Sequence, residues 1–354
     1  MKTKHIKQLK LALFRLSLFG VCGLYIPLML AVACLIIHFT FHDAIRLLAI
    51  ILYIISSGIL LLLAKRFRKA LKIFSLINLF VILWFIFIPA SNERNWDAEV
   101  AKLPLIEQNG DLLSIKNFRN FKYAEGKDVE VKFDHRTFDL GQLEGTDLII
   151  SYWDNYRTIS HTFLSFRFKG GQNIAISLEV RKQEGESYHP LKGMFKQYEL
   201  IYVIGDERDL IPLRTKVRKE QTFLYPMNLN IEHSKLFLLD IIKAANSLHD
   251  SPQFYHSIGR NCTTGMIDHL NTIRDFKIPT SKKIILNGIS DYYAYQLEGI
   301  PTDLPFDVLK RCCYISETSN ALALDDNYSQ NLRQVINKRL KNERLKRAPS
   351  AKLY

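Results

Sequence analysis

The sequence predicts an α+β domain that follows three membrane-spanning helices. Three long apolar runs occupy the first 90 residues, and each is long enough to cross a hydrocarbon core of about 30 Å as a helix. Residues 91–330 then show strand patterns in their first half and helix patterns in their second half. That order is typical of α+β domains.

The apolar runs cover about residues 16–37, 47–64 and 73–90, and none of them contains a charged residue. A secretory signal peptide has a single apolar stretch of about 7 to 15 residues, so we expect the first run to be retained as a membrane helix. Two spans followed by a buried helical hairpin are the alternative. We favour three spans because the third run is among the most apolar.

Basic residues flank these runs unevenly. Residues 1–90 hold 11 Lys and Arg but a single acid, Asp43, and the basic residues cluster before the first run and between the second and the third. By the positive-inside rule, both clusters face the cytoplasm. Three crossings then place the following domain outside the cytoplasm, which predicts a multi-pass protein of the bacterial inner membrane with a periplasmic domain.

The charge distribution also bears on the partners. The formal net charge is +13, yet residues 91–330 are slightly acidic, and the excess lies in the first 90 residues and in residues 331–354. A nucleic-acid-binding protein would carry its basic residues on the folded domain. We therefore expect a membrane as a partner and no nucleic acid.

Alternating and apolar patterns define the elements of the domain at residues 91–330. The expected strands cover residues 129–133, 147–153, 159–168, 174–181, 199–204 and 222–225. Helical spacing of apolar residues predicts helices at residues 232–249, 262–273 and 303–311. The basic segment 330–347 predicts a helix in a C-terminal tail, residues 331–354, that is either solvated or lies on anionic lipid headgroups.

Common metal, cofactor and serine-hydrolase motifs are missing. The sequence has no H-E-x-x-H, no C-x-x-C, no G-x-G-x-x-G, no P-loop and no G-x-S-x-G. We therefore expect neither a metal nor a cofactor. A cysteine paired with a histidine is the remaining nucleophilic chemistry.

Cys262 is the best-placed of the five cysteines. Cys22 and Cys34 lie in the first apolar run, and Cys312 and Cys313 are adjacent, which favours packing or pairing with another thiol. Cys262 follows a glycine turn and opens an apolar-periodic helix, where the positive end of the helix dipole favours a thiolate. A buried structural cysteine at a helix start is the alternative.

A predicted hairpin supplies the histidine. If residues 169–171 form a three-residue loop, His161 lies directly opposite Glu179 in the paired strands. Leu164 and Ile176 then share the other face, which is apolar and must face the core. A carboxylate beside His161 could orient its ring as in a Cys-His-acid triad. A solvated outer face with an incidental His-Glu pair is the alternative.

Several segments of this region resemble the Lnb N-terminal periplasmic domain family. They are residues 160–166, 176–188, 198–210 and 260–264, which occur in the matching order. The resemblance covers roughly residues 100–275 and implies a circularly permuted papain-like domain, with an antiparallel sheet and the nucleophilic cysteine at a helix N-terminus. It also implies a thiol enzyme with a catalytic Cys262, His161 and Glu179, related to bacterial lipoprotein N-acyltransferases.

The expected function is therefore a membrane-anchored thiol acyltransferase. It would take a fatty acyl chain from a phospholipid through a Cys262 thioester and transfer it to the N-terminal amino group of a lipoprotein. Two alternatives remain: a cysteine hydrolase, acting on the cell wall or on lipids with the same triad, and a non-catalytic envelope module.

Further residues are expected to bind the substrate or its oxyanion. Asn261 and Thr263 stand at the start of the predicted helix, where backbone N–H groups can stabilise an oxyanion. Arg181 could bind a lipid phosphate or pair with a nearby glutamate. The family resemblance alone adds Tyr188 and Arg208.

Overall fold

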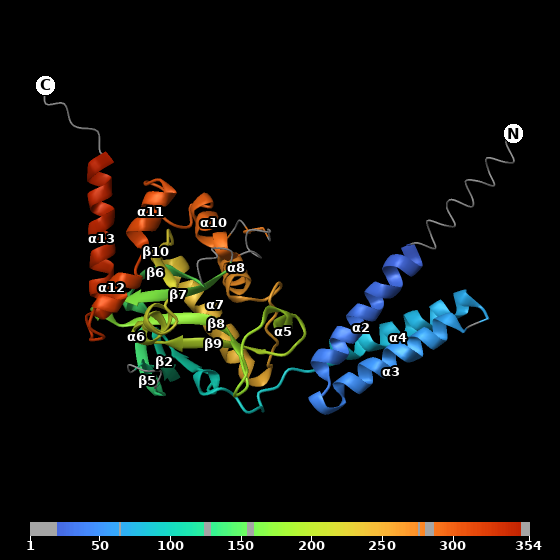
Figure 1. Cartoon of the computed structure of the whole chain (residues 1–354). Coiled ribbons are helices and arrows are strands. Elements are labelled where there is room, and N and C mark those ends of the chain that lie inside the picture. The colour runs from blue at the N-terminus through green and yellow to red at the C-terminus, as the bar shows by residue number, and fades with distance from the viewer. Residues whose placement is uncertain are drawn as a thin grey trace, which may run out of the picture. The chain divides into compact units, whose positions relative to one another are not determined.

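The computed structural model describes residues 20–63, 65–123, 129–153, 159–274, 277–279 and 287–347. The chain divides into two compact units, residues 1–90 and residues 91–354 (Figure 1). Residues 16–19, the start of the first predicted span, lie outside the described residues.

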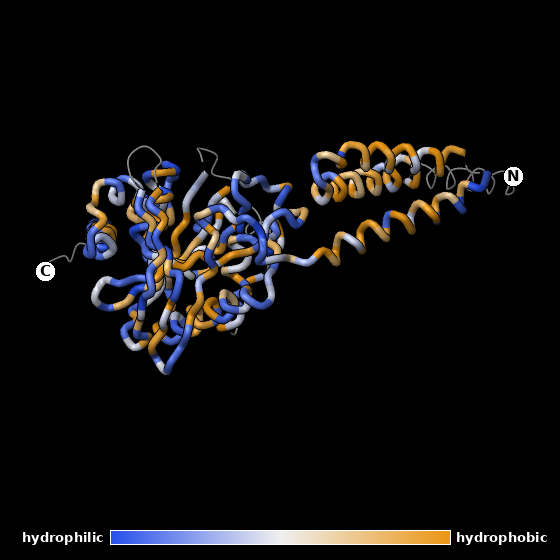
Figure 2. The backbone as a smooth tube through the Cα atoms, turned by 90° about the horizontal axis from the view of Figure 1, so that it is seen from below, coloured by the Kyte–Doolittle hydropathy of each residue, from blue (hydrophilic) through white to orange (hydrophobic). Residues whose placement is uncertain are grey.

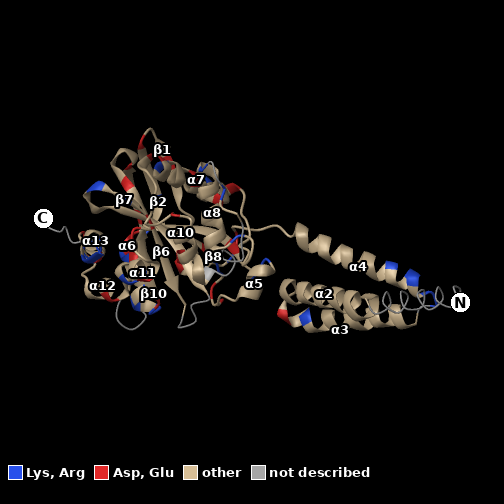
Figure 3. Cartoon of the chain, turned by 90° about the horizontal axis from the view of Figure 1, so that it is seen from above, with Lys and Arg blue, Asp and Glu red and all other residues tan. Residues whose placement is uncertain are grey.

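The first unit consists of three apolar helices, each long and apolar enough to cross a membrane (Figure 2). A π-helical turn, Gly20–Tyr25, continues into α2, Ile26–Thr40, and is followed by α3, Asp43–Leu62, and α4, Phe67–Phe87. The predicted three spans are confirmed. The last two helices begin earlier than their apolar runs because charged residues extend them at the N-terminal end, as Figure 3 shows.

Few polar contacts join these three helices. The Tyr53 hydroxyl donates to Asn78 Oδ1 at 2.9 Å, and the Tyr25 and Ser75 hydroxyls lie 2.8 Å apart. Most of the large aliphatic side chains of α3 and α4 point outward and are exposed. An outward apolar surface on a small helical group is what contact with lipid requires.

The second unit is built on an eight-stranded sheet. The strand order is β1-β2-β9-β8-β7-β6-β10, with β5 also paired to β2, and every pair is antiparallel except β2 with β9. Its strands are β1 Leu105–Asn109, β2 Leu112–Arg119, β5 Phe133–Asp139, β6 Leu143–Tyr152, β7 Ser160–Phe168, β8 Asn173–Arg181, β9 Glu199–Gly205 and β10 Gln221–Pro226.

The predicted α+β class with an antiparallel sheet is confirmed, but one expected strand differs. Residues 129–133 do not form one strand, because β4, Val129–Glu130, pairs with β3, Lys122–Tyr123, in a separate small sheet. Phe133 already belongs to β5 of the main sheet. Strands β1 and β2, and all of β5 beyond Phe133, were not predicted from the sequence.

Helices α7, Ile231–Asp250, and α8, Cys262–Ile273, cover the apolar face of the sheet (Figure 1). The rings of Phe166 and Phe237 meet at 5.8 Å between β7 and α7. Gly265 lets α8 approach β8 closely, since a Cβ there would lie 2.5 Å from a methyl carbon of Leu178. The close packing holds the first turn of α8 against β7 and β8.

The opposite face of the sheet is polar but not solvated. It is covered by α6, Glu207–Pro212, α12, Ser316–Ala321, and α13, Tyr328–Arg347. The Ser165 hydroxyl donates to Glu207, and Arg333 of α13 contacts both Glu207, at 2.5 Å, and Asp147, at 2.7 Å. The alternative of a solvated outer face is therefore not what the structure shows, because buried ion pairs satisfy these polar groups.

The C-terminal helix is likewise part of the domain. Leu332, Ile336 and Leu340 of α13 are buried, at the helical spacing of one apolar face. Residues 331–347 therefore do not form the separate solvated tail expected from their charge. The remaining short helices of this unit are α5 Pro190–Met194, α10 Ser290–Gln296 and α11 Phe306–Cys313.

The hairpin register is the predicted one. Leu164 pairs with Ile176 and Phe163 pairs with Ser177 across β7 and β8. Gly170 and Gly171 in the connecting turn have φ of 80° and 81°, a left-handed conformation that glycine adopts without strain. This register places His161 and Glu179 on one face, at the end of the hairpin away from the turn.

Candidate active site

The first turn of α8 presents Cys262. Asn261 caps the helix: its Oδ1 accepts hydrogen bonds from the Thr263 and Thr264 N–H groups, both at 2.9 Å, and its own N–H donates to the Thr264 hydroxyl. This capping box fixes the helix start, so the Cys262 side chain has a defined direction. Cys262 is 5% exposed.

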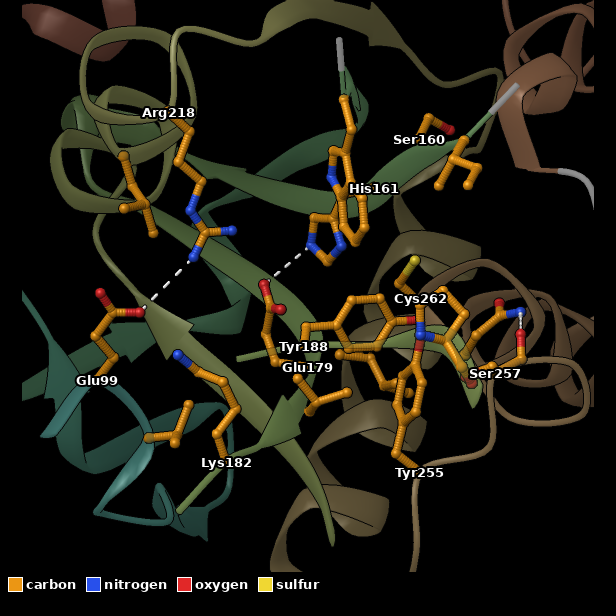
Figure 4. Close-up of a pocket in the computed structure, with 18 of the residues that line it drawn as sticks. Glu99, Ser160, His161, Glu179, Lys182, Tyr188, Arg218, Tyr255, Ser257 and Cys262 are labelled. Carbon is orange, nitrogen blue, oxygen red and sulfur yellow. Dashed lines mark hydrogen bonds and ion pairs between the residues drawn. The ribbon is translucent and has the colours of Figure 1, made fainter. Parts of the chain in front are cut away.

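His161 and Glu179 meet beside this cysteine (Figure 4). The Nε2 atom of His161 lies 2.6 Å from the Ser177 hydroxyl oxygen and 3.0 Å from Glu179 Oε1, and the Cys262 thiol faces the same imidazole (Figure 4). Because Nε2 faces Glu179, the thiol is left to interact with Nδ1. Cys262, His161 and Glu179 therefore lie in a row, from the N-terminus of α8 to β7 and β8.

The electrostatics favour an ionised Cys262. Burial opposes ionisation, but the imidazole of His161 and the N–H of Thr162 stabilise the thiolate and lower the pKa of Cys262. Burial and the charge of Arg214 act to lower the pKa of His161, yet Glu179 and Cys262 outweigh them and raise it. The two shifts together favour a thiolate-imidazolium pair.

Arg214 and Ser177 complete the surroundings of Glu179. The Arg214 guanidinium donates to Glu179 Oε1 at 2.6 Å, and the Ser177 hydroxyl donates to the same oxygen at 2.8 Å. Although burial acts to raise it, His161 and Arg214 hold the pKa of Glu179 well below its usual range. Glu179 is therefore a charged, fixed acceptor for the imidazole. Arg214 was not predicted as a site residue. The only feature of the sequence that marks it is its position, as a basic residue shortly after a helix with an internal proline.

The three groups line a cavity of about 380 Å³ (Figure 4). One part of its wall is apolar and aromatic, and another carries charged side chains. The apolar and aromatic lining residues are Val100, Trp153, Ile159, Leu178, Val180, Tyr188, Pro190, Met194, Leu213, Tyr255 and Ile258. Such a lining suits an amphiphilic substrate.

Two tyrosines lie beside the thiol. Tyr188 and Tyr255 both line the cavity, with their rings 6.3 Å apart in an edge-to-face contact. Burial raises the pKa of Tyr255 well above its usual value, and the neighbouring Cys262 raises it further. Its proton is therefore firmly held, as a hydrogen-bond donor to an anion requires. Tyr188 was expected at the site, whereas Tyr255 was missed, although it lies only seven residues before Cys262.

The expected oxyanion role of Asn261 and Thr263 does not fit the geometry. Both side-chain groups of Asn261 are engaged, Oδ1 by the helix N–H groups and Nδ2 by the Ser257 carbonyl at 2.9 Å. The Thr263 N–H already donates to Asn261, and its hydroxyl lies 3.1 Å from that of Thr162. The donor groups expected to stabilise an oxyanion are therefore used to cap the helix.

Arg181 has a structural role. Its guanidinium donates to the Val100 and Ala101 carbonyls at 3.1 and 2.8 Å, and to Asn92 Oδ1 at 2.8 Å. It also stacks over the Trp96 ring, 4.3 Å from its centroid. Arg181 therefore holds the segment before β1 against the sheet. Among the described residues, Arg181 forms no ion pair with Glu184 or Glu186, and its guanidinium donors are used by the carbonyl groups and by Asn92.

Arg208 lies at another site. Its guanidinium pairs with Asp206 at 2.8 Å and with Asp326 at 2.7 Å. These residues line a separate polar cavity together with Gly170 and Gly171 of the hairpin turn. Arg208 therefore does not contribute to the cavity around Cys262.

The other cysteines do not contribute to this cavity either. Cys312 and Cys313 are buried free thiols in α11, and burial raises the pKa of both. A buried thiol with a raised pKa is typical of an inert cysteine that only packs in the core. Among the described residues, no group of three or more His, Cys, Asp or Glu side chains is arranged to hold a metal ion.

One comparison with known proteins gives a match, over part of the chain. Residues 130–288 match the family model of the Lnb N-terminal periplasmic domain, which confirms the resemblance predicted from the sequence. The match contains β6 to β10, α7 and α8, and therefore Cys262, His161 and Glu179. No curated protein and no solved structure matches the chain.

Proposed function

We propose that this chain, an Lnb N-terminal periplasmic domain behind three apolar helices, is a membrane-anchored thiol acyltransferase of the bacterial envelope. It would move a fatty acyl chain from a phospholipid to the N-terminal amino group of a lipoprotein through a thioester on Cys262. The observation that carries the proposal is the Cys262-His161-Glu179 line in a cavity with an apolar wall.

The first half-reaction forms the acyl-enzyme. His161 accepts the proton of Cys262, and the thiolate attacks the ester carbonyl carbon of the phospholipid, forming a C–S bond and a tetrahedral oxyanion. The oxyanion collapses, the ester C–O bond breaks, and the imidazolium of His161 gives its proton to the leaving alkoxide. The products are a lysophospholipid and the Cys262 thioester.

The second half-reaction forms the amide. The neutral α-amino group of the lipoprotein attacks the thioester carbonyl, and His161 accepts a proton from the attacking nitrogen. Collapse of the second tetrahedral intermediate breaks the C–S bond and returns the proton to the sulfur. The energy of the original ester supports the transfer, so no nucleotide is consumed.

The oxyanion needs hydrogen-bond donors in both halves. Since the Thr263 N–H is occupied, we assign this role to the hydroxyls of Tyr255 and Tyr188, which lie beside the thiol. Tyr255 is suited to it because its raised pKa keeps the donor proton in place.

We also propose the orientation of the membrane helices. The basic residues before the first helix and those between α3 and α4 would lie in the cytoplasm. The domain that carries Cys262 would then lie in the periplasm, where phospholipids and lipoproteins are accessible from the outer leaflet of the inner membrane.

Mass spectrometry of the intact protein tests the chemistry. After incubation with phospholipid, the wild-type chain should gain the mass of one acyl group, and hydroxylamine should remove it. Cys262→Ser should gain no hydroxylamine-labile mass. An adduct that water discharges but a lipoprotein amine does not would indicate the hydrolase, and wild-type behaviour of the variant in cells would indicate the non-catalytic module.

A further inference from the structure

We infer that the charged end of the Cys262 cavity binds the phosphodiester of a glycerophospholipid headgroup through Arg218 and Lys182. The inference rests on the proposed function and names how the acyl donor would be recognised. Both side chains line the same cavity as Cys262. Figure 4 shows Glu179 and His161 lying between Arg218 and Cys262.

Arg218 has unused hydrogen-bonding capacity. Within the part of the chain that the structure describes, its guanidinium makes no hydrogen bond, and its closest carboxylate is Glu99, at 3.7 Å. The side chain is 36% exposed, so it reaches the cavity yet loses much of its contact with water. Burial and the neighbouring charge of Arg214 lower its pKa, which means that an anion beside Arg218 would be favoured.

The neighbouring arginines differ from Arg218 in this respect. Arg214 donates to Glu179 at 2.6 Å, and Arg119 binds both oxygens of Asp209 at 2.8 and 2.9 Å. Each of those two is held by a short contact to a carboxylate. Arg218 is thus the arginine at the cavity that is available to a ligand.

Lys182 supplies a second cation. Its ammonium group lies 3.3 Å from Asp97, which uses one of its three donors. The side chain is 22% exposed and lines the same cavity as Glu99 and Arg218 (Figure 4). A fork-shaped guanidinium and a point-charge ammonium together match the non-bridging oxygens of a phosphodiester.

The rest of the cavity indicates what carries the anion. Trp153, Ile159, Met194 and Ile258 form an apolar wall in the same cavity. A glycerophospholipid places its phosphodiester a few bonds from the acyl ester and its acyl chains, so it can contact both walls at once. A peptide with free carboxylates would leave the apolar wall unfilled.

Two short-chain lipids that differ only in the headgroup test this inference. The full chain in detergent is incubated with dihexanoylphosphatidylethanolamine or with dihexanoylglycerol, and acyl mass on Cys262 is followed over time. The wild-type chain should be acylated at least tenfold faster by the phospholipid. Arg218→Gln should reduce this ratio about tenfold or more, whereas Arg311→Gln, on the exposed surface of α11, should keep it.

Equal rates with both lipids in the wild-type chain, or an unchanged ratio in Arg218→Gln, would overturn the inference while leaving the acyltransferase proposal intact. Acylation by neither lipid would instead count against the acyltransferase. In that case lipid binding tests the inference separately, and it is measured as the rate at which iodoacetamide alkylates Cys262. The phospholipid should slow alkylation in the wild-type chain but not in Arg218→Gln, and equal protection in both chains would refute it.

Discussion

Replacing Glu179 by glutamine tests the candidate site most directly. In the wild-type chain, Glu179 Oε1 accepts hydrogen bonds from His161, Arg214 and Ser177. Glutamine keeps the size of the side chain and one acceptor oxygen but removes the negative charge. The imidazolium that forms when Cys262 ionises then loses its counterion, and Arg214 keeps only its longer contact to Glu220, at 3.7 Å.

The expected loss follows from the charge. At a separation of about 4 Å and an effective dielectric constant of about 20, the imidazolium-carboxylate interaction is worth about 4 kcal/mol. The glutamine carbonyl retains a hydrogen bond worth about 1.5 kcal/mol, which leaves a deficit of about 2.5 kcal/mol. At about 1.4 kcal/mol for each factor of ten, thioester formation should slow about 100-fold.

The assay is single-turnover acylation of Cys262, combined with alkylation of its thiol across pH. The pKa of Cys262 is lowered in the wild-type chain, so alkylation should begin below the usual thiol range, and Glu179→Gln should shift the profile to higher pH. Adding Arg214→Gln should recover part of the rate, because it removes a positive charge next to the imidazolium that Glu179 no longer balances. Wild-type acylation and an unchanged alkylation profile in Glu179→Gln would refute the assigned role.

The other predictions concern the nucleophile, the oxyanion, the buried ion pairs and the topology. Cys262→Ala and His161→Ala should each abolish acylation without changing the thermal unfolding temperature by more than a few degrees; measurable acylation in either would contradict the triad. Tyr255→Phe should lower the acylation rate about 10- to 100-fold with little change in half-saturating lipid, and an unchanged rate would exclude it as a donor. Arg333→Met leaves the buried Glu207 without a cation, while Asp147 keeps Arg167 at 3.0 Å, and should cost about 3 to 5 kcal/mol of unfolding free energy. Arg311→Met, at an exposed position of α11, should cost less than about 1 kcal/mol. An alkaline phosphatase fused after Tyr354 should be active, and an inactive fusion together with an active cytoplasmic reporter would reverse the proposed orientation.

The hairpin shows how much local sequence could predict. A two-glycine turn between two strands limits the loop length, and the loop length determines every cross-strand pair, so His161 and Glu179 could be brought together from sequence alone. Cys262 could be placed at a helix start because the glycine turn, the asparagine and the apolar period occur together. These inferences depend on neighbours in sequence.

Residues that depend on long-range packing could not be predicted in the same way. Arg214 reaches Glu179 from a π-helical turn after α6, and no local pattern specifies that contact. Arg181 shares a strand face with Glu179, yet the segment before β1 covers it and satisfies its donors. Alternation along a strand identifies the polar face of a sheet, but it does not say which element covers that face.

The polar face explains how the fold keeps the site in register. His161 and Ser165 lie on the same face of β7, and Asp147 of β6 is the cross-strand partner of Ser165. Glu207 and Arg333 bind these groups near the hairpin turn, while Glu179 holds His161 near the open end. A slip of β7 by one residue would turn His161, Ser165 and Arg167 toward the apolar helices and take them away from their polar partners, at a cost of several kcal/mol for each buried charge left unpaired. The ion pairs that cover this face therefore also keep the imidazole on the side of the sheet where Glu179 can hold it.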